Sequence, residues 1–533
     1  MVIKLVGSVY YKMIQRQICM CFRQRIILKP EFFLKNNQAL GFLKTNILLI
    51  PTQVRTLGNQ HHQSYLSSYR KVSTEEVTKP IISLVNEILK LKDARATSLV
   101  VENRLRSLMF LYINLKKDEK DDFLKIMATD YSVNHGIVAN LSKQLADMDP
   151  SSAGGMLLKT EDKLRELLTP QYVWLFSHLS RIDGGIKFLV DLRCDILALL
   201  SIIDTKSPLY SVMQQMNSAL KEQLSVFFSG EFLRLQRVTW SSPASLLQKI
   251  SDYEAVHPVR SWTDIRQRVG PYRRCFIFTH HSLPDEPLVV LYVALTEEIS
   301  DSLKNIIYST GDEEIVKSNV HEEQLLNIKA FIFYSISATQ KGLQGIDLGN
   351  YIIKQAAKEL HSEYSFVTRF STLSPIPTFR HWLIEKMKAA ERGEDVFPTN
   401  EWKEILDLIN PEDNADAWAK LRSMLSNNSW IKVENFVNAL KAPLMTSCSR
   451  YLYLEKRRGY ALDSVANFHL RNGAVMWRLN WLADTSPHTL THSCGLMVNY
   501  RYYLDAVDTN SLKYIQGRSI TASEQIMKLS RAS

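Results

Sequence analysis

The hydrophobic period of the chain changes near Ser229–Gly230, and this change constrains the possible folds more than any other feature. Before it, apolar residues recur every three or four positions, as in 81–89 and 105–113, which is the spacing of amphipathic helices. Turn-forming glycines interrupt the pattern at Gly184–Gly185. No motif in this stretch indicates catalysis, so we predict an all-helical bundle over 75–228 with an oligomerisation or regulatory role.

After the change, alternating apolar and polar residues predict a strand at FLRLQRVTW (232–240). Short apolar runs rich in β-branched and aromatic residues predict further strands at CFIFTH (275–280), LVVLYVAL (288–295) and AFIFYSIS (330–337). Helical spacing returns at 348–364, and again from about 379 to 445, where we expect a helical insertion. A chain of 533 residues is too long for one compact core. We therefore predict an α+β multidomain protein in which the helical bundle precedes an α/β domain over 229–533.

Residues 1–74 form a separate, strongly basic segment. They hold eleven of the 65 lysine and arginine residues and only one of the 55 acidic residues, so this segment alone equals the formal charge of +10. The remaining chain has 54 charges of each sign, whereas a nucleic-acid-binding surface needs a basic excess, so we expect no nucleic-acid partner. An acid-poor head with Arg16, Arg23 and Arg25 among isoleucines is typical of a mitochondrial transit peptide. An extension without a targeting role is the alternative.

The sequence also argues against metal sites and membrane spans. Six scattered cysteines without a CxxC pair do not form a disulfide framework. Metal-binding side chains crowd only at His280–His281 and at His492 with Cys494, and neither place has a second ligand pair at zinc spacing. The best candidate for a membrane span, CDILALLSII (194–203), is too short and is flanked by charged residues. We predict no metal and no transmembrane segment.

The stretch FIFYSISATQKGLQGIDLGNYIIKQAAKEL (331–360) is the most informative part of the sequence. An apolar strand enters a turn that contains Gly342, Gly345 and Gly349, and an amphipathic helix follows. Glycines let backbone N–H groups approach an anion, and the start of a helix adds partial positive charge. The turn fits neither a Walker loop nor the GxGxxG spacing of dinucleotide-binding folds. It can hold a pyrophosphate, or it can simply reverse the chain.

Six blocks of the chain occur in order: HPVRSWTDIRQRVGPYRRCFIF (257–278), EPLVVLYVALT (286–296), YSISATQKGLQGIDLG (334–349), STLSPIPTF (371–379), GYALDSVANFHLRNGAVMWRLNWLAD (459–484) and SCGLMVNYRYYL (493–504). With these blocks the chain resembles the malonyl-CoA decarboxylase family over about 75–515. The resemblance implies an N-terminal helical domain and a catalytic domain similar to the GNAT-type acetyltransferases. It also implies conversion of malonyl-CoA to acetyl-CoA and CO₂, which controls malonyl-CoA levels in fatty acid metabolism.

The resemblance places a catalytic pair on Ser374 of LSPIP and His469 of NFHLRNG. Loss of CO₂ from a malonyl thioester leaves negative charge on the α-carbon, and the adjacent thioester carbonyl takes up this charge as an enolate. The reaction therefore requires no cofactor beyond the CoA of the substrate. His469 would donate a proton or polarise the enolate, and Ser374 would contact the malonyl group. Without the family, a lone histidine is by default a structural hydrogen-bonding residue, and a serine before proline is a turn former.

Other site residues are expected to support this pair. Ser335 of YSIS lies on the strand that leads into the glycine turn, Tyr502 of NYRYY could hydrogen-bond the pair, and Asp347 stands where the family commonly has glutamate. Lys249 of LLQKIS matches a family lysine and could meet a phosphate or carboxylate, although exposed lysines are usually only solvated. The resemblance also assigns the CoA pyrophosphate to a binding turn made of Gln344, Gly345, Ile346, Asp347, Leu348, Gly349 and Asn350.

Two other functions are compatible with such a fold. An acyl-CoA-dependent acyltransferase would need an acceptor channel, and the LSPIP and NFHLRNG blocks argue against it. A catalytically inactive CoA-binding regulator would not need Ser374 and His469, which are both present. The family resemblance further implies malonyl-CoA as the ligand and a homo-oligomer, by analogy a tetramer.

The basic head also predicts where the protein acts. It favours the mitochondrial matrix, with removal of the presequence before the helices begin near residue 75. A peroxisomal location is disfavoured, because the chain ends Ser530–Arg531–Ala532–Ser533 rather than with a Ser-Lys-Leu type tripeptide. Initiation at an internal methionine such as Met20 would give a cytosolic form.

Overall fold

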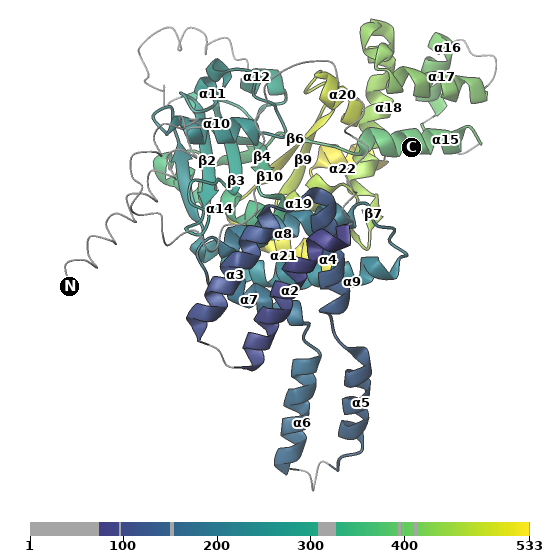
Figure 1. The fold of residues 1–533 in the computed structure, drawn as a ribbon. Helices are drawn as coiled ribbons and strands as arrows, with labels where there is room; N and C mark the ends of the chain where they lie inside the picture. Colours follow the sequence, from purple (N-terminus) through teal and green to yellow (C-terminus); the bar gives the residue numbers. More distant parts are fainter. Residues whose placement is uncertain are drawn as a thin grey trace, which may run out of the picture. The chain divides into compact units, whose positions relative to one another are not determined.

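A computed structural model describes residues 74–94, 97–149, 154–307, 327–392, 396–397, 399–409 and 414–531 (Figure 1). The chain divides into two compact units, Met1–Lys71 and Val72–Ser533. Residues 1–73 of the predicted presequence lie outside the described residues. Every element described below therefore belongs to the second unit.

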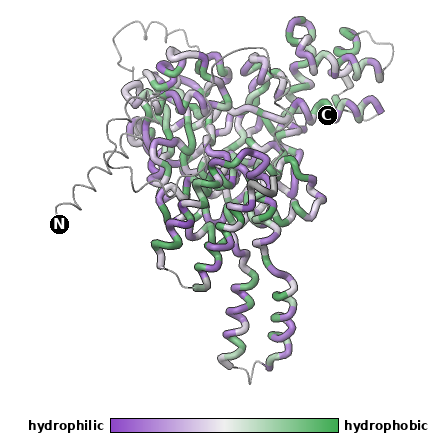
Figure 2. Tube along the Cα trace, in the orientation of Figure 1, coloured by the Kyte–Doolittle hydropathy of each residue, from purple (hydrophilic) through white to green (hydrophobic). Residues whose placement is uncertain are grey.

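The N-terminal part of this unit is helical, as predicted. Its helices are α2 (Thr74–Asp93), α3 (Ser98–Ile113), α4 (Lys117–Asp130), α5 (His135–Ala146), α6 (Gly154–Leu167), α7 (Gln171–Leu179), α8 (Gly185–Leu200) and α9 (Pro208–Phe227). Helix α3 buries Leu105, Leu108 and Tyr112, one turn apart, which confirms the helical period read from the sequence. Helices α5 and α6 pair with each other, and hydrophilic and hydrophobic residues intermix along both (Figure 2).

The described strands after residue 230 form a mixed sheet of eight strands in the order β1-β2-β3-β4-β5-β10-β6, with β9 also paired to β10. The strands are β1 (Arg234–Val238), β2 (Arg273–Thr279), β3 (Val289–Thr296), β4 (Ala330–Ala338), β5 (Arg369–Thr372), β6 (Ser374–Pro375), β9 (Val475–Asn480) and β10 (Met497–Tyr502). Strands β4 and β5 are parallel, and the other pairs are antiparallel. The α+β class is confirmed, and β1 to β4 lie at the predicted runs.

Strands β2, β3 and β4 are buried on both faces, which explains why they read as continuous apolar runs. In β4, Phe331 and Phe333 pack into a core that also contains the helices of the N-terminal part and α14 (Leu348–Glu363). The alternate residues Ile332 and Tyr334 pack into a smaller core with α10 (Ala244–Asp252), α11 (Trp262–Arg268) and α12 (Leu303–Ile307). The period of two residues therefore assigns each side chain to one core.

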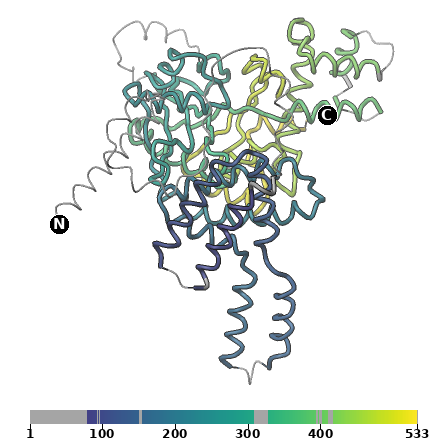
Figure 3. Tube along the Cα trace, viewed as in Figure 1, coloured from purple at the N-terminus to yellow at the C-terminus, as the bar shows by residue number. Residues whose placement is uncertain are grey.

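The predicted helical stretch after residue 379 contains α15 (Phe379–Ala390), α16 (Thr399–Ile409), α17 (Asn414–Ser426) and α18 (Glu434–Tyr453). Helix α18 passes through Pro443 and continues beyond the expected end of the insertion at 445. The chain then forms a small hairpin of β7 (Lys456–Arg457) and β8 (Tyr460–Ala461), followed by α19 (Ser464–Arg471), α20 (Pro487–Ser493), α21 (Val507–Gly517) and α22 (Glu524–Arg531). The C-terminal strands β9 and β10, yellow in Figure 3, thus return to the sheet begun by β1 to β5.

Candidate active site

A pocket opens where two parallel strands separate. The pairing of β4 with β5 ends at Phe333 and Thr372, although β4 continues to Ala338. The chain after β5 turns instead into β6, which pairs with β10. Between them lies a cavity of about 510 Å³, which is lined by Ser335 and Ile336 on one side and by Ser374 on the other. The sheet thus exposes backbone and side chains of its interior to a ligand.

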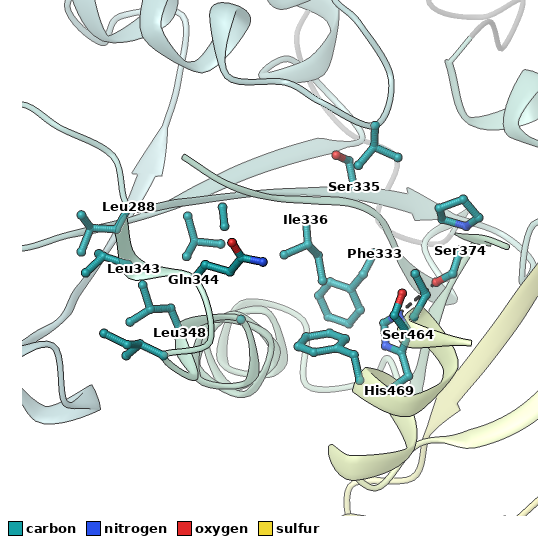
Figure 4. A pocket seen from close by; sticks show the side chains of 18 of the residues that line it. Leu288, Phe333, Ser335, Ile336, Leu343, Gln344, Leu348, Ser374, Ser464 and His469 are labelled. Atoms are coloured by element: carbon teal, nitrogen blue, oxygen red, sulfur yellow. Dashed lines mark hydrogen bonds between the residues drawn. The ribbon is translucent and has the colours of Figure 1, made fainter. Parts of the chain in front are cut away.

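The walls of the pocket are largely apolar at one end and carry polar side chains at the other. Leu288, Leu343 and Leu348 lie at one end, and Ser374 and His469 lie at the opposite end (Figure 4). A volume in this range suits a small ligand or one arm of a larger one. The arrangement fits an elongated, mostly apolar chain that ends in a polar reacting group.

Three buried side chains form a hydrogen-bonded row at the polar end. Ser374 Oγ lies 3.1 Å from His469 Nε2, and His469 Nδ1 lies 2.8 Å from Tyr502 Oη. The three residues come from β6, α19 and β10, and each is at most 5% exposed. Ser374 and His469 are 95 residues apart in the sequence, and the fold brings them into contact.

Burial determines the charge of this histidine. Desolvation lowers the pKa of His469 to about 3, so the imidazole is neutral near pH 7. Desolvation also raises the pKa of Tyr502, whose hydroxyl therefore keeps its proton and donates to Nδ1. Nε2 then carries the imidazole proton and points it toward Ser374 Oγ. The ring of Tyr500 stacks on the imidazole, with ring centroids 4.5 Å apart.

A fourth polar residue, Thr372, orients the serine. Ser374 Oγ donates to Thr372 Oγ1 at 2.8 Å, and the backbone N–H of Tyr500 donates to the same oxygen at 3.1 Å. Thr372 is fully buried and does not line the pocket. With its proton directed at Thr372, Ser374 has a lone pair free to accept from His469. The row therefore has one consistent direction from Tyr502 to Thr372.

The glycine turn at the other end is held by the helical part of the chain. Arg193 of α8 is buried and donates to the carbonyl oxygens of Gly342 and Gln344, and to Asn217 of α9. A Cβ atom on Gly342 would lie 1.9 Å from the carbonyl oxygen of Val190, so α8 contacts the turn directly and only glycine fits there. The helices therefore fix the conformation of this turn.

The structure brings most of the predicted site residues to the pocket. Ser374, His469 and Ser335 line it, and Tyr502 reaches it through His469. Ser335 Oγ donates to the buried carboxylate of Glu254, at 2.8 Å and 3.0 Å from its two oxygens. Five residues of the predicted binding turn also line the pocket: Gln344, Gly345, Ile346, Leu348 and Gly349.

Three predicted residues lie elsewhere. Asp347 precedes the first residue of α14 and is exposed, and its carboxylate accepts from Asn350 at 3.4 Å. Neither of these two side chains lines the pocket. Lys249 of α10 donates to Glu286 at 2.7 Å and to the backbone oxygen of Asp285, so the structure does not bring it to the pocket. A lysine already paired with a carboxylate lacks a free charge for a phosphate.

Sequence reasoning missed Arg193 and Thr372. Arg193 stands on the face of α8 that buries Leu189, Leu192 and Ile196, and a charged residue within such an apolar face signals a buried polar partner. Thr372 precedes Ser374 by two positions in an extended segment, where side chains two apart share a face. Both features can be seen in the sequence, but neither indicates which residue is the hydrogen-bond partner.

In the described part of the chain, no group of three or more histidine, cysteine, aspartate or glutamate side chains is arranged to hold a metal ion. None of the helices that the structure describes is long and apolar enough to cross a membrane.

Two family models match this chain in its two halves. The family model described as the malonyl-CoA decarboxylase N-terminal domain matches residues 131–228, and the model for the C-terminal domain matches residues 231–533. The mitochondrial malonyl-CoA decarboxylase of Rattus norvegicus is 46% identical over 415 residues, which are 77% of this chain and 82% of the relative. That of Mus musculus is 46% identical over 416 residues, with the same coverage of both chains.

Solved structures agree with this. The crystal structure of malonyl-CoA decarboxylase from Rhodopseudomonas palustris is 28% identical, with a TM-score of 0.70, and the match covers 85% of this chain and 99% of that one. The enzyme from Agrobacterium vitis is 26% identical, with a TM-score of 0.69, and the match covers 85% of this chain and all of that one. On the matches over both halves of its sequence, this chain belongs to the malonyl-CoA decarboxylase family.

Proposed function

We propose that this protein is a carboxy-lyase that converts malonyl-CoA to acetyl-CoA and CO₂. The observation that carries the proposal is the buried row of Ser374, His469 and Tyr502 at the polar end of a largely apolar pocket. Relatives that are 46% identical over most of the chain are named malonyl-CoA decarboxylases. The activity would control the level of malonyl-CoA in fatty acid metabolism.

The pocket suggests how the substrate lies. The pantetheine arm would occupy the apolar section near Leu288 and Ile336, which places the thioester beside Ser374 and His469. The CoA pyrophosphate would lie at the turn 344–350, where backbone N–H groups precede α14. Phosphates cannot enter the apolar section without losing their solvation, so they belong at its mouth.

In the proposed reaction, the bond between the carboxylate carbon and the malonyl α-carbon breaks. Its electron pair passes to the thioester carbonyl as an enolate, and CO₂ leaves. A proton then reaches the α-carbon and restores the carbonyl. The thioester is itself the electron sink, so this chemistry calls for no cofactor beyond the CoA of the substrate. The protein must stabilise the enolate oxygen and deliver the proton.

His469 and Ser374 suit these two tasks. The neutral imidazole directs its Nε2 proton at Ser374, and a negatively charged substrate in the same pocket favours the protonated imidazole, because an opposite charge raises its pKa. On substrate binding the imidazole takes up one proton from solvent at Nδ1, and the Tyr502 hydroxyl turns to accept from this N–H. His469 can then donate its Nε2 proton to the α-carbon. Ser374 Oγ accepts from Nε2–H and so holds this proton of His469 beside the malonyl group, which Ser374 contacts. Tyr502 holds the imidazole in this orientation through Nδ1.

The remaining site residues have supporting roles in this proposal. Ser335 faces the pocket with its hydroxyl fixed by Glu254, so it contributes shape and a polar contact near the acyl group. Asp347 orders the start of α14 with Asn350 rather than touching the reacting atoms. Lys249 is left out of the site, because Glu286 neutralises it.

The organisation of the chain belongs to the same proposal. We assign residues 1–74 to a presequence, 75–228 to a helical domain and 229–533 to a catalytic domain that resembles the GNAT-type acetyltransferases, with a helical insertion at about 379–445. Matches to separate N- and C-terminal family models support the boundary near 229, and the separation of parallel strands β4 and β5 around the pocket supports the GNAT likeness. A tetramer of the chain is proposed from family resemblance.

We also propose a mitochondrial matrix location, because the relatives are named mitochondrial and residues 1–74 are basic. Fusing residues 1–74 to a fluorescent protein tests this. Import into mitochondria supports it, and a diffuse cytosolic signal would overturn it.

The activity is tested by incubating the purified protein with malonyl-CoA alone. Formation of equal amounts of acetyl-CoA and CO₂ without an acceptor supports decarboxylation. Product formation only in the presence of an amine acceptor would refute it and would point to acyl transfer. The Ser374→Ala variant serves as the matched control, because it removes one hydroxyl from the pocket and leaves the CoA turn unchanged.

A further inference from the structure

We propose that Lys221, on α9 of the helical part, binds the phosphate groups of CoA at the turn before α14. The inference rests on the proposed function, because it names a further binding residue for the same substrate. None of the sequence blocks that carry the family resemblance lies in α9, and the predicted binding turn contains no cationic side chain. The charge for a diphosphate must therefore come from elsewhere in the fold.

The structure places the Lys221 ammonium directly over the turn. Gly345 has φ of +79°, and a Cβ atom built on it would lie 3.3 Å from Lys221 Nζ and 3.5 Å from Cε. The ammonium is therefore within about 5 Å of the Gly345 Cα atom. Gly345 lines the pocket. Within the described part of the chain, no ion pair or hydrogen bond of the Lys221 ammonium is found, so its charge is free for a ligand.

The turn beside Lys221 is built to offer N–H donors. Arg193 occupies the carbonyl oxygens of Gly342 and Gln344, which turns these acceptors toward α8. Among the described residues, the backbone N–H groups of Gly345 and Asp347 have no acceptor. Free N–H groups supply directional hydrogen bonds to an anion, and a nearby ammonium supplies the charge. The two features occur together because α8 packs against the turn and Lys221 of α9 reaches Gly345.

The local balance of charge also favours a phosphate. Lys341 lines the same pocket and adds a second cation on the strand side of the turn. Asp347 is the acidic residue of the turn, but it does not line the pocket, and its carboxylate accepts from Asn350. The mouth of the pocket therefore carries a positive excess next to Gly345. A diphosphate, which is doubly charged, matches this excess.

Truncated substrates test the proposal. The kinetics of the full-length protein would be compared for malonyl-CoA and malonyl-pantetheine, which lacks all phosphates, in Lys221→Met and in a control, Lys159→Met. Lys159 is an exposed lysine on α6, a helix with no buried residue, so both changes remove one charge from a helix surface. We expect Lys221→Met to raise KM for malonyl-CoA about ten-fold with kcat unchanged, as for loss of one charge-assisted hydrogen bond. KM for malonyl-pantetheine should not change.

Calorimetric binding of CoA and of pantetheine gives a readout without turnover. Lys221→Met should weaken CoA binding about ten-fold and leave pantetheine binding unchanged, whereas Lys221→Arg should retain most of the CoA affinity. Equal losses for CoA and pantetheine, or no difference between Lys221→Met and Lys159→Met, would overturn the proposal. A wild-type protein that releases no CO₂ but shows the expected difference in CoA binding would refute the proposed activity and leave the role of Lys221 standing.

Discussion

Replacing Thr372 with valine removes one oxygen atom from the interior and keeps the shape of the side chain. That oxygen accepts two hydrogen bonds, from Ser374 Oγ at 2.8 Å and from the backbone N–H of Tyr500 at 3.1 Å. Thr372 is fully buried, so water cannot replace the lost acceptor. The change therefore tests whether the hydroxyl of Ser374 must be oriented for turnover.

Two effects of different size are expected. The unpaired N–H of Tyr500 should lower the free energy of unfolding by about 1–3 kcal/mol, the cost of an unsatisfied buried donor. Turnover should fall about five- to ten-fold, which corresponds to about 1–1.4 kcal/mol, because one neutral hydrogen bond no longer directs the Ser374 proton away from His469. The KM for malonyl-CoA should change little, because Thr372 does not line the pocket.

Thr372→Ser is the matched control. It keeps the acceptor and loses a buried methyl group, which should cost about 1 kcal/mol of stability while turnover stays near that of the wild type. Denaturant unfolding measures the stability of both variants, and steady-state kinetics measure kcat and KM. The two substitutions thus reduce stability by similar amounts but should differ in turnover.

A double-mutant cycle decides whether Thr372 acts through Ser374. In a Ser374→Ala background, Thr372→Val should have almost no further effect on kcat, because the hydroxyl that it orients is gone. Thr372→Val turning over at the wild-type rate, or Thr372→Ser losing as much turnover as Thr372→Val, would refute the reasoning.

Three other outcomes can be measured on the same protein. His469→Asn should reduce kcat by about 10²-fold or more and leave CoA affinity close to wild type, because removal of a general acid costs about 10²–10⁴ in rate. A variant that keeps more than a tenth of the wild-type rate would contradict the role of His469 as proton donor. Gly345→Val should raise KM strongly, because valine is strained at φ of +79° and its Cβ would crowd Lys221; unchanged CoA binding by the folded variant would place the phosphates elsewhere. Burial lowers the pKa of His469 to about 3 and, with nearby Arg268, that of His257 to about 4. In the unfolded chain both histidines bind protons below about pH 6.5, whereas in the folded protein they stay neutral. The free energy of unfolding should therefore fall by about 1 kcal/mol per pH unit for each histidine as the pH drops from about 6.5 toward 4. A free energy of unfolding that does not change with pH, measured by urea unfolding at each pH, would exclude this linkage.

The sequence predicts the periodic parts of this fold well, for a physical reason. The run 330–337 became β4, and 348–364 became α14, because both are long segments whose apolar residues keep one period. Strand β10 (Met497–Tyr502) was not predicted, although it lies between β5 and β6. Its sequence MVNYRY mixes apolar and polar residues, and Asn499 is buried through hydrogen bonds to two backbone oxygens that only the fold supplies.

The catalytic pair shows a different limit. Composition and spacing gave Ser374 and His469 no more weight than other serines and histidines, and only the family resemblance singled them out. Their proximity depends on β6 and α19 meeting across a sequence separation of 95 residues, and pairwise contact at that range is not encoded in a local pattern. Arg193 and Lys221 were missed because they act on a turn about 150 and 120 residues away, through contacts between α8, α9 and that turn.

The helical stretch between the two catalytic residues raises the question of how their distance is kept. Thr378, just before α15, lies 2.5 Å from the hydroxyl of Tyr451 near the end of α18, and that hydroxyl also contacts Asp463 at 3.3 Å. Asp463 is buried, which raises the pKa of its carboxyl group, and it caps the first turn of the helix that carries His469 through the N–H of Ala466. Both ends of the stretch are therefore tied to one tyrosine. Because Thr378 follows Ser374 by four residues, this link fixes the start of α19 relative to β6 and so keeps the histidine beside the serine.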